Sequence, residues 1–294
     1  MKKYLIALMV LLVLFSTVAC GKEEKKVVVA SKPHSEQYIL SEMISQLIEA
    51  KTDITVERKF GIGGGTSNIH PGMVSGEIDI YPEYTGTGWL FVLKKDLVRD
   101  PEELYMKTKE LYESEYGILW LDRYGFNNTF ALALEEGKAK EMGIESYSDL
   151  SEKGKELVFG AEYDFFERED GFPGLVKEYG FSFSDEKELD IGLKYQAIGN
   201  DEVDVINAFS TDGLIKEYNL KVLKDDKNYF PSYECATLVR KETLEKYPEL
   251  KDVLNSMANA ISDKEMQDLN YKVEKENALP EKVAEEFLKM KGLL

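Results

Sequence analysis

The first nineteen residues set the conditions under which the rest of this chain folds. Lys2 and Lys3 precede an almost unbroken apolar run from Tyr4 to Phe15, and small residues follow it at 16–19. A basic start, about a dozen apolar residues and a small-residue end are typical of a secretory signal peptide. The run is shorter than the ~20 apolar residues that span a membrane. We therefore predict that residues 1–19 are a signal peptide and that the remainder folds outside the cell.

Cys20 follows Val18 and Ala19 directly. This arrangement resembles a bacterial lipobox, whose cysteine is diacylated and becomes the new N-terminus. Thr17 stands where leucine is commonest, so an ordinary secreted signal with an incidental cysteine stays open as an alternative. The charged residues at 20–25 suit a polar tether between a lipid anchor and a folded body. We predict lipidation at Cys20, which places the protein on the extracytoplasmic face of the cell membrane.

Charge and cysteine content limit what the folded body can be. Removing residues 1–19 takes away two lysines, so the formal net charge of −18 becomes −20. Nucleic acid is excluded as a partner, because binding a phosphate backbone needs clustered Lys and Arg. With Cys20 carrying lipid, only Cys235 remains, so no intramolecular disulfide can form. The fold must depend on its hydrophobic core, and no second apolar stretch of membrane length follows residue 20.

Short apolar runs alternate with helical patterns along the chain, which predicts an α/β fold. A glycine-rich turn at 61–68 leads into one of the helices. The expected strands lie near 26–30, 54–60, 78–81, 118–121, 129–134, 157–161, 203–208, 221–223 and 236–239. The other expected helices lie near 35–50, 101–116, 138–143, 173–179, 212–218, 242–262 and 280–291.

The usual signatures of catalysis are missing from the sequence. The turn at 61–66 lacks the Gly-Lys-Ser/Thr ending of a phosphate loop, and no Gly-x-Ser-x-Gly elbow occurs. His34 and His70 lie far apart without metal-ligand spacing to cysteine or acids. Cys235 has no histidine near it in sequence, which indicates a small buried residue. We predict no catalytic residue, no metal and no cofactor, and we expect a protein that is not an enzyme.

Two tyrosines occupy turns rather than helical core positions. Tyr84 lies in Pro-Glu-Tyr-Thr-Gly-Thr and Tyr233 in Phe-Pro-Ser-Tyr-Glu. Aromatic rings at helical spacing are usually core, but rings on loops after strands are well placed to line a cleft. The sequence therefore points to an aromatic cleft that includes Tyr84 and Tyr233.

The most specific signals are Tyr-Pro-Glu-Tyr-Thr-Gly-Thr at 81–87 and Phe-Phe-Glu-Arg-Glu-Asp-Gly at 165–171. Further blocks occur in the same order at 64–68, 75–80, 125–132 and 209–213. Together, over residues 26–294, the chain resembles the substrate-binding proteins of glycine betaine/choline/carnitine ABC transporters, the osmoprotectant family. The resemblance implies a two-lobed fold of the type II periplasmic-binding-protein class, with a ligand cleft between lobes that close like a flytrap. It places residues 26–126 and 234–294 in the first lobe and 127–233 in the second.

The resemblance also implies how the ligand is bound. A quaternary ammonium has no N–H to donate, so aromatic faces recognise it through cation–π contacts of ~0.5–2 kcal/mol each. The family's four-ring box corresponds here to Tyr84, Phe130, Phe209 and Tyr233, with Thr87 as a further contact. Two of these rings are Phe where relatives commonly have Tyr, which makes the pocket drier and admits a ligand bulkier than glycine betaine.

A betaine also carries a carboxylate, for which the resemblance implies Lys32 and Arg168, with a weaker contribution from Gln37. Arginine can hold a carboxylate bidentately, whereas lysine acts as a point charge. This pair favours a zwitterionic betaine over choline. Two alternatives remain: Lys32 as a plain surface lysine, and Arg168 as an ion-pair partner of the acids at 167, 169 and 170.

The expected function is a lipid-anchored receptor that captures a glycine betaine-like solute and delivers it to the membrane permease of an ABC importer. Choline, carnitine and a bulkier betaine such as ergothioneine stay open as ligands. A surface enzyme acting on small amines and a sensor that reports its ligand to a partner are the other functional classes considered.

Overall fold

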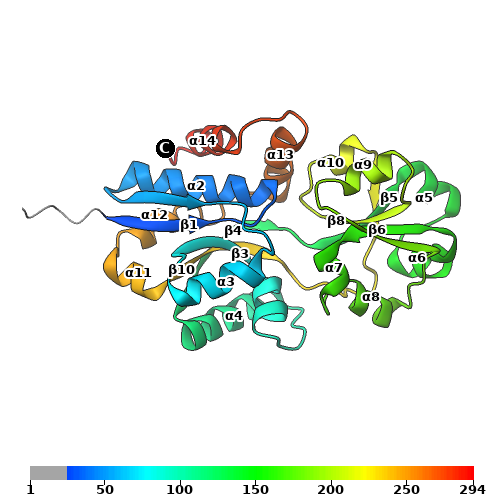
Figure 1. Ribbon diagram of the computed structural model, residues 1–294, viewed down its shortest axis with the longest axis horizontal. Coiled ribbons are helices and arrows are strands. Elements are labelled where there is room, and N and C mark those ends of the chain that lie inside the picture. The colour runs from blue at the N-terminus through cyan, green and yellow to red at the C-terminus, as the bar shows by residue number, and fades with distance from the viewer. Residues whose placement is uncertain (1–24) are drawn as a thin grey trace, which may run out of the picture.

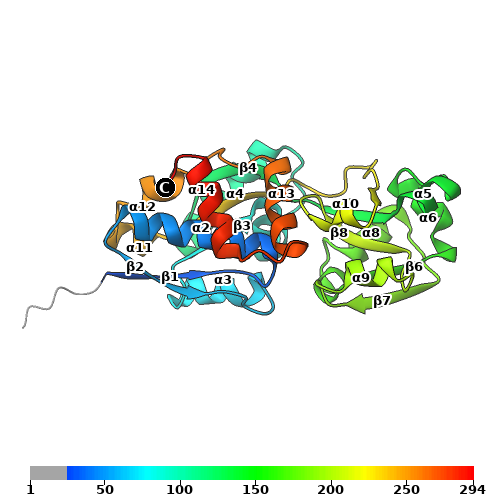
Figure 2. The same cartoon turned by 90° about the horizontal axis from the view of Figure 1, so that it is seen from above.

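The computed structural model describes residues 25–294, which form two lobes side by side (Figures 1 and 2). Within these residues each lobe holds a five-stranded sheet, in the order β2-β1-β3-β10-β4 and β7-β6-β8-β5-β9. The signal peptide and Cys20 lie outside the described residues. The first sheet consists of β1 (Lys26–Ala30), β2 (Thr55–Lys59), β3 (Ile80–Tyr84), β4 (Ile118–Asn127) and β10 (Glu234–Arg240). The second consists of β5 (Phe130–Glu135), β6 (Val158–Glu162), β7 (Asp185–Leu189), β8 (Val205–Phe209) and β9 (Leu220–Val222).

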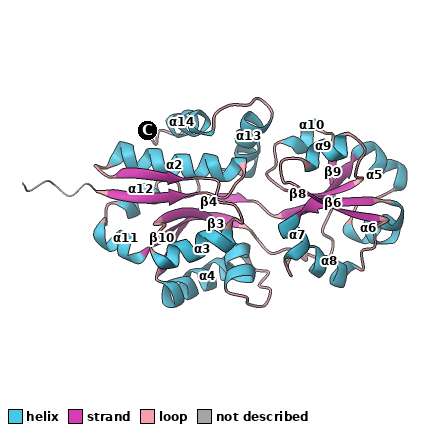
Figure 3. Cartoon of the chain, in the orientation of Figure 1, coloured by secondary structure: helices cyan, strands magenta, loops and turns pink. Residues whose placement is uncertain are grey.

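Helices cover both faces of each sheet (Figure 3). In the first lobe, α2 lies with α13 and α14 on one face, and α3 and α4 lie on the other. The apolar sides of these helices and both sheet faces make the cores, as α/β layering requires. The first-lobe helices are α2 (Ser35–Lys51), α3 (Thr66–Ser75), the π-helical turn η1 (Thr87–Val92), α4 (Pro101–Tyr116), α11 (Lys241–Lys246), α12 (Leu250–Asn255), α13 (Asp263–Glu274) and α14 (Pro280–Met290). The second-lobe helices are α5 (Glu136–Met142), α6 (Tyr147–Lys153), the short 3₁₀ turn η2 (Gly154–Glu156), α7 (Tyr163–Glu167), α8 (Phe172–Tyr179), α9 (Lys194–Gly199) and α10 (Leu214–Glu217).

Strand direction brings residues distant in sequence to one edge of each sheet. In the first sheet β1 runs parallel to β2 and β3, and β10 runs antiparallel to β3 with Cys235 opposite Tyr84. In the second sheet β5 runs antiparallel to β8, and Phe130 stands opposite Phe209. Directly opposed residues on antiparallel strands have Cβ atoms only about 4.5–5.5 Å apart. The register therefore places Phe130 next to Phe209 before any loop contributes.

Two connections join the sheets within the described residues. β4 leads almost directly into β5 through Asn128 and Thr129, and the return path runs over 223–233 from β9 to β10. Both connections end beside the aromatic residues named above. The crossovers thus place the start of β5 and the start of β10 at the boundary between the lobes.

The C-terminal region differs from the sequence prediction. The single helix expected at 242–262 is wrong: α11 ends at Lys246 and α12 begins at Leu250. Pro248 explains the break, because the residue before a proline avoids helical geometry, and Tyr247 has φ −132° and ψ 71°. The unpredicted α13 begins at Asp263, and its N-cap Ser262 forms a capping box with Glu265.

Cys235 is a free and fully buried thiol on β10, as the sequence predicted. Among residues 25–294, no helix has the length and apolar character that a membrane crossing requires.

Candidate functional site

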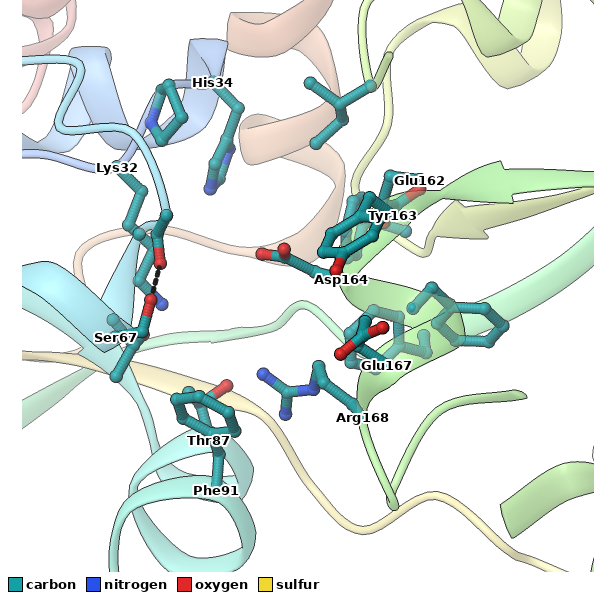
Figure 4. A pocket seen from close by; sticks show the side chains of 18 of the residues that line it. Lys32, His34, Ser67, Thr87, Phe91, Glu162, Tyr163, Asp164, Glu167 and Arg168 are labelled. Atoms are coloured by element: carbon teal, nitrogen blue, oxygen red, sulfur yellow. Dashed lines mark hydrogen bonds between the residues drawn. The ribbon is translucent and has the colours of Figure 1, made fainter. Parts of the chain in front are cut away.

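A cleft of about 570 Å³ lies between the lobes, where strands of both sheets end. This is where open α/β sheets commonly bind ligands. The first lobe lines the cleft with the loop after β1, the glycine-rich turn before α3 and the residues after β3; the second contributes α7, the loop after β7 and the ends of β5 and β8 (Figure 4). Seven of the eight predicted ligand residues line it: Lys32, Tyr84, Thr87, Phe130, Arg168, Phe209 and Tyr233.

Phe130 is at the centre of the aromatic side of the cleft. Its ring centroid lies 5.1 Å from that of Phe209 and 5.4 Å from that of Tyr233, the latter edge-on. Phe165 lies behind it at 5.2 Å. Tyr84 lines the same cleft from the end of β3. The structure therefore gathers four rings from β3, β5, β8 and the start of β10.

Gly86 fixes the position of the Tyr233 ring. A Cβ built on Gly86 would lie 2.6 Å from that ring, closer than atoms can approach. The backbone of Gly86 has ordinary right-handed helical angles, so its role is spatial. Tyr233 itself is 2% exposed and has little freedom to move away. Any side chain at position 86 would push this ring from its place in the cleft.

The tyrosine hydroxyls are engaged with protein carboxylates. Tyr84 Oη donates to Glu36 Oε1 at 2.6 Å, and Tyr233 Oη donates to Asp170 Oδ2 at 3.2 Å. Burial raises the pKa of both tyrosines well above its ordinary range, so both remain neutral phenols. The rings therefore offer a ligand their faces, and in this respect Tyr84 and Tyr233 resemble the two phenylalanines.

Protein cations lie over three of the four rings. Lys32 Nζ is 4.9 Å from the centroid of Tyr84, and Lys194 Nζ is 4.5 Å from that of Phe209. The Arg168 guanidinium lies 5.6 Å from the centroid of Phe130. These are cation–π distances. Three of the four rings therefore already make cation–π contacts, and two of the cations, Lys32 and Arg168, line the cleft.

Lys32 and Arg168 are both ion-paired. Lys32 Nζ donates to Glu83 Oε1 at 2.5 Å in a buried site, so Lys32 is not a plain surface lysine. Arg168 Nε donates to Asp170 Oδ1 at 2.8 Å, and its Nη2 donates to Oδ2 at 2.5 Å. Burial alone lowers the pKa of Arg168, but the charge and hydrogen bonds of Asp170 raise it above its ordinary value. Arg168 thus forms the ion pair with Asp170 that the sequence left open as an alternative, and both cations also line the cleft.

Gln37 lies behind the cleft rather than in it. Its Oε1 accepts from the backbone N–H of Lys32 at 3.3 Å, and its Nε2 donates to the carbonyl of Pro82 at 3.0 Å. Gln37 therefore ties the Lys32 loop to β3 and does not line the surface that a ligand would touch.

The sequence did not predict Phe91. η1 places Phe91 one turn after Thr87, and both face the Arg168 guanidinium across the cleft (Figure 4). The guanidinium carbon is 4.9 Å from the Phe91 ring centroid. The sequence indicated only that an aromatic residue lies four positions after Thr87. It could not show that the two side chains share a face, because π-helical turns have no recognised sequence pattern.

His34, which lies beside Lys32, and the acidic residues on the opposite side of the cleft were also not predicted (Figure 4). His34 stacks on Phe209 with centroids 6.3 Å apart, and burial together with the charges of Lys32 and Lys194 lowers the pKa of His34 to about 3. This histidine is therefore neutral. Asp164 projects into the cleft from α7 (Figure 4). The other acidic lining residues are Glu162, Glu167 and Asp190. His34 and these acidic residues offer a ligand hydrogen-bond acceptors in addition to the aromatic rings.

No group of three or more His, Cys, Asp or Glu side chains within 25–294 is arranged to hold a metal ion.

Comparison with known proteins identifies the family. Residues 25–290 match the family described as "Substrate binding domain of ABC-type glycine betaine transport system". The ergothioneine transport permease/ergothioneine binding protein of Helicobacter pylori is 47% identical over 92% of this chain, which spans about half (48%) of that relative's length. The carnitine transport binding protein of Listeria monocytogenes is 36% identical, with 98% of this chain and 97% of that protein covered.

Two solved structures carry the same architecture. One is described as a glycine betaine/carnitine/choline ABC transporter and matches with a TM-score of 0.75 at 35% identity, covering 91% of this chain and 99% of that one. The other is apo YehZ of Escherichia coli, with a TM-score of 0.68 at 29% identity, covering 92% and 100%. The two-lobed α/β fold is therefore that of type II periplasmic binding proteins.

Proposed function

The chain belongs to the family of substrate-binding domains of ABC-type glycine betaine transport systems, and from this membership we propose that it captures a trimethylammonium betaine outside the cell and delivers it to the permease of an ABC importer. Members of this family bind solutes for transport. We further propose that this chain is not an enzyme, because aromatic rings and ion pairs line its cleft.

The aromatic box is the observation on which the proposal depends. Four rings meet in one cleft, and the hydroxyls of Tyr84 and Tyr233 are already bonded to carboxylates. The ring faces themselves offer no hydrogen-bond acceptor for the N–H groups of a primary ammonium, but they suit a cation covered by methyl groups. Lys32 and Arg168 border the same cleft and supply N–H donors for a carboxylate. A cation and an anion on one small solute describe a betaine.

Among betaines, we place ergothioneine first. Glycine betaine consists of little more than its ammonium and carboxylate. It therefore has no N–H group to donate to the acceptors of His34, Glu162 and Asp164. A betaine with an N–H-bearing heterocycle would present donors to those acceptors. The 47% identity to an ergothioneine binding protein, against 36% for a carnitine binding protein, supports the same order.

A thermal-shift screen tests this function. Ligand at 100 times its Kd stabilises the folded state by about 2.7 kcal/mol. We expect the largest shift with ergothioneine, smaller shifts with carnitine and glycine betaine, and the smallest with choline. Mass spectrometry of the recovered solute should return it unchanged. If no quaternary ammonium compound raises the melting temperature, the proposed function is wrong; if a product is recovered, the protein is an enzyme.

Lobe closure belongs to the proposed mechanism. Tyr84 and Thr87 lie in the segments assigned to the first lobe (26–126 and 234–294), whereas Phe130, Arg168 and Phe209 lie in the segment assigned to the second (127–233). A ligand that contacts both sets gains most when the lobes approach each other. The two crossovers, at 128–129 and 223–233, are where such a motion would bend the chain.

The lipid anchor is a further part of the proposal, resting on the sequence around Cys20. Replacing Cys20 with Ser is expected to move the protein from the membrane fraction to the soluble fraction, because the acyl chains attach only through that sulfur. Cys235→Ser is the matched control, since this thiol is buried within β10 and its loss should leave the protein with the membrane. A Cys20→Ser protein that still sediments with membranes would rule out the anchor.

A further inference from the structure

Glu36 is a carboxylate buried behind the cleft. It is the second residue of α2, is 2% exposed and does not line the cleft itself. Burying an ionised carboxylate is costly unless its oxygens are fully hydrogen-bonded. A buried acid at this position therefore needs a structural or functional reason.

Four neutral donors surround this carboxylate. Oε1 accepts from Tyr84 Oη at 2.6 Å and from Asn128 Nδ2 at 2.8 Å. Oε2 accepts from Thr211 Oγ1 at 2.6 Å and from Asn270 Nδ2 at 3.0 Å. Burial raises the pKa of Glu36, and these four hydrogen bonds act against that rise. No ion pair involves Glu36 in the part of the chain that the structure describes, so neutral donors and the N-terminus of α2 hold its charge.

The donors come from four separate segments. Tyr84 ends β3 and is a ring of the aromatic box, and Asn128 is in the first crossover. Thr211 follows β8 in the second lobe, two residues after Phe209. Asn270 belongs to α13, at the end of the first lobe that faces the second (Figure 2). Asn270 Nδ2 also lies 2.9 Å from the carbonyl oxygen of Thr211. One carboxylate thus joins the ligand cleft, a crossover and both lobes.

We propose that Glu36 is a positioning residue for ligand capture: it fixes the Tyr84 ring through its hydroxyl and holds the turn after Phe209 against the first lobe. The inference rests on the proposed function, since it concerns affinity for a trimethylammonium solute. Glu36 acts without touching that solute. It links the orientation of a box ring to the position of the second lobe, so that neither can change independently.

Glu36→Gln tests the proposal. The amide keeps the shape of the side chain but has one acceptor oxygen in place of two, so two of the four donors lose their partner. We expect the affinity for ergothioneine, glycine betaine and choline to fall alike, by about tenfold or more, because the Tyr84 ring and the turn after Phe209 are no longer both held in the position that binds the solute. The ratio of affinities among the three solutes should stay as in the wild type, because Glu36 does not line the cleft and contacts none of their chemical groups.

Tyr84→Phe and Thr211→Val separate the two ends of the link. Each removes one hydroxyl and keeps the bulk of the side chain. Each is expected to weaken binding several-fold, and Thr211→Val should also change the radius of gyration measured by X-ray scattering with saturating solute. In combination with Glu36→Gln, the loss should be clearly less than additive for the hydroxyl that the amide leaves without its acceptor, since those two changes remove the same hydrogen bond.

Glu42→Gln is the control, because Glu42 is on the same helix, is 8% exposed and pairs with Arg58 away from the cleft. It should leave Kd unchanged, and melting temperatures should accompany every titration. If Tyr84→Phe and Thr211→Val bind as the wild type does, the inference is overturned, even if Glu36→Gln is too unstable to measure. A wild-type protein that binds none of the three solutes would instead contradict the proposed function.

Discussion

Replacing Tyr84 or Tyr233 with alanine will weaken binding of every trimethylammonium solute by about 1–3 kcal/mol, through lost cation–π contact and lost apolar burial. We expect Tyr233→Ala to have the larger effect. Its ring packs edge-on against Phe130, and its hydroxyl bonds Asp170, the partner of Arg168. Titration calorimetry with ergothioneine, glycine betaine and choline measures the loss for each.

Tyr247→Ala is the matched control for these substitutions. Tyr247 is 5% exposed, comparable to the 6% of Tyr84, and belongs to the first-lobe core without lining the cleft. It should lower the melting temperature while leaving Kd close to the wild-type value. Equal Kd losses in Tyr247→Ala and Tyr84→Ala would show that the box variants act through stability alone, and the aromatic box would then be wrong.

Arg168→Ala will separate betaines from choline. A charge-assisted hydrogen bond to a carboxylate contributes about 1.5–3 kcal/mol, so betaine affinity should fall by about tenfold to a hundredfold. Choline has no carboxylate to lose. The substitution also leaves Asp170 without its cation beside the box, and this uncompensated negative charge favours a cationic ligand. We therefore expect choline affinity to stay level or rise in the same titrations.

Two further variants decide what Arg168 does. Arg168→Lys keeps the charge but cannot hold a carboxylate bidentately, so its betaine affinity should fall between those of the wild type and Arg168→Ala. Arg123→Ala removes an arginine that pairs with Glu102 and Glu234 outside the cleft and should change neither affinity. If Arg168→Ala weakens betaine and choline equally, the guanidinium supports the fold rather than the ligand.

Most of the strands were predictable from sequence, but β7 (Asp185–Leu189), whose residues are mostly charged, was not. Short apolar runs predicted the positions of β1, β5 and β8, and the family motifs pointed to Phe130 at the start of β5 and Phe209 at the end of β8. The strand register then explains why Phe130 and Phe209 meet. Local patterns suffice for these strands because their apolar runs are clear, whereas Phe130 and Phe209 were assigned to the ligand by the family resemblance.

The supporting residues could not be predicted in the same way. Glu36 reads as an ordinary acid in the first turn of an amphipathic helix, and nothing local indicates that donors 48 to 234 positions away surround it. Gln37, next to it, was expected at the ligand and instead holds the Lys32 loop. The chain sequence shows which residue types are present, but side-chain partners from distant segments are decided only by packing of the whole fold.

The cations already lying over the rings have a consequence for selectivity. Lys32 and Arg168 line the cleft and are covalently attached to the protein, so they act as built-in competitors whose effective concentration at the rings is high and cannot be diluted. A small inorganic cation gains little by displacing an ammonium that is already in place. A trimethylammonium group brings apolar methyl surface that the internal cations lack, and burying that surface adds free energy that the competitors do not have. This competition disfavours inorganic cations at the rings without a separate barrier against them.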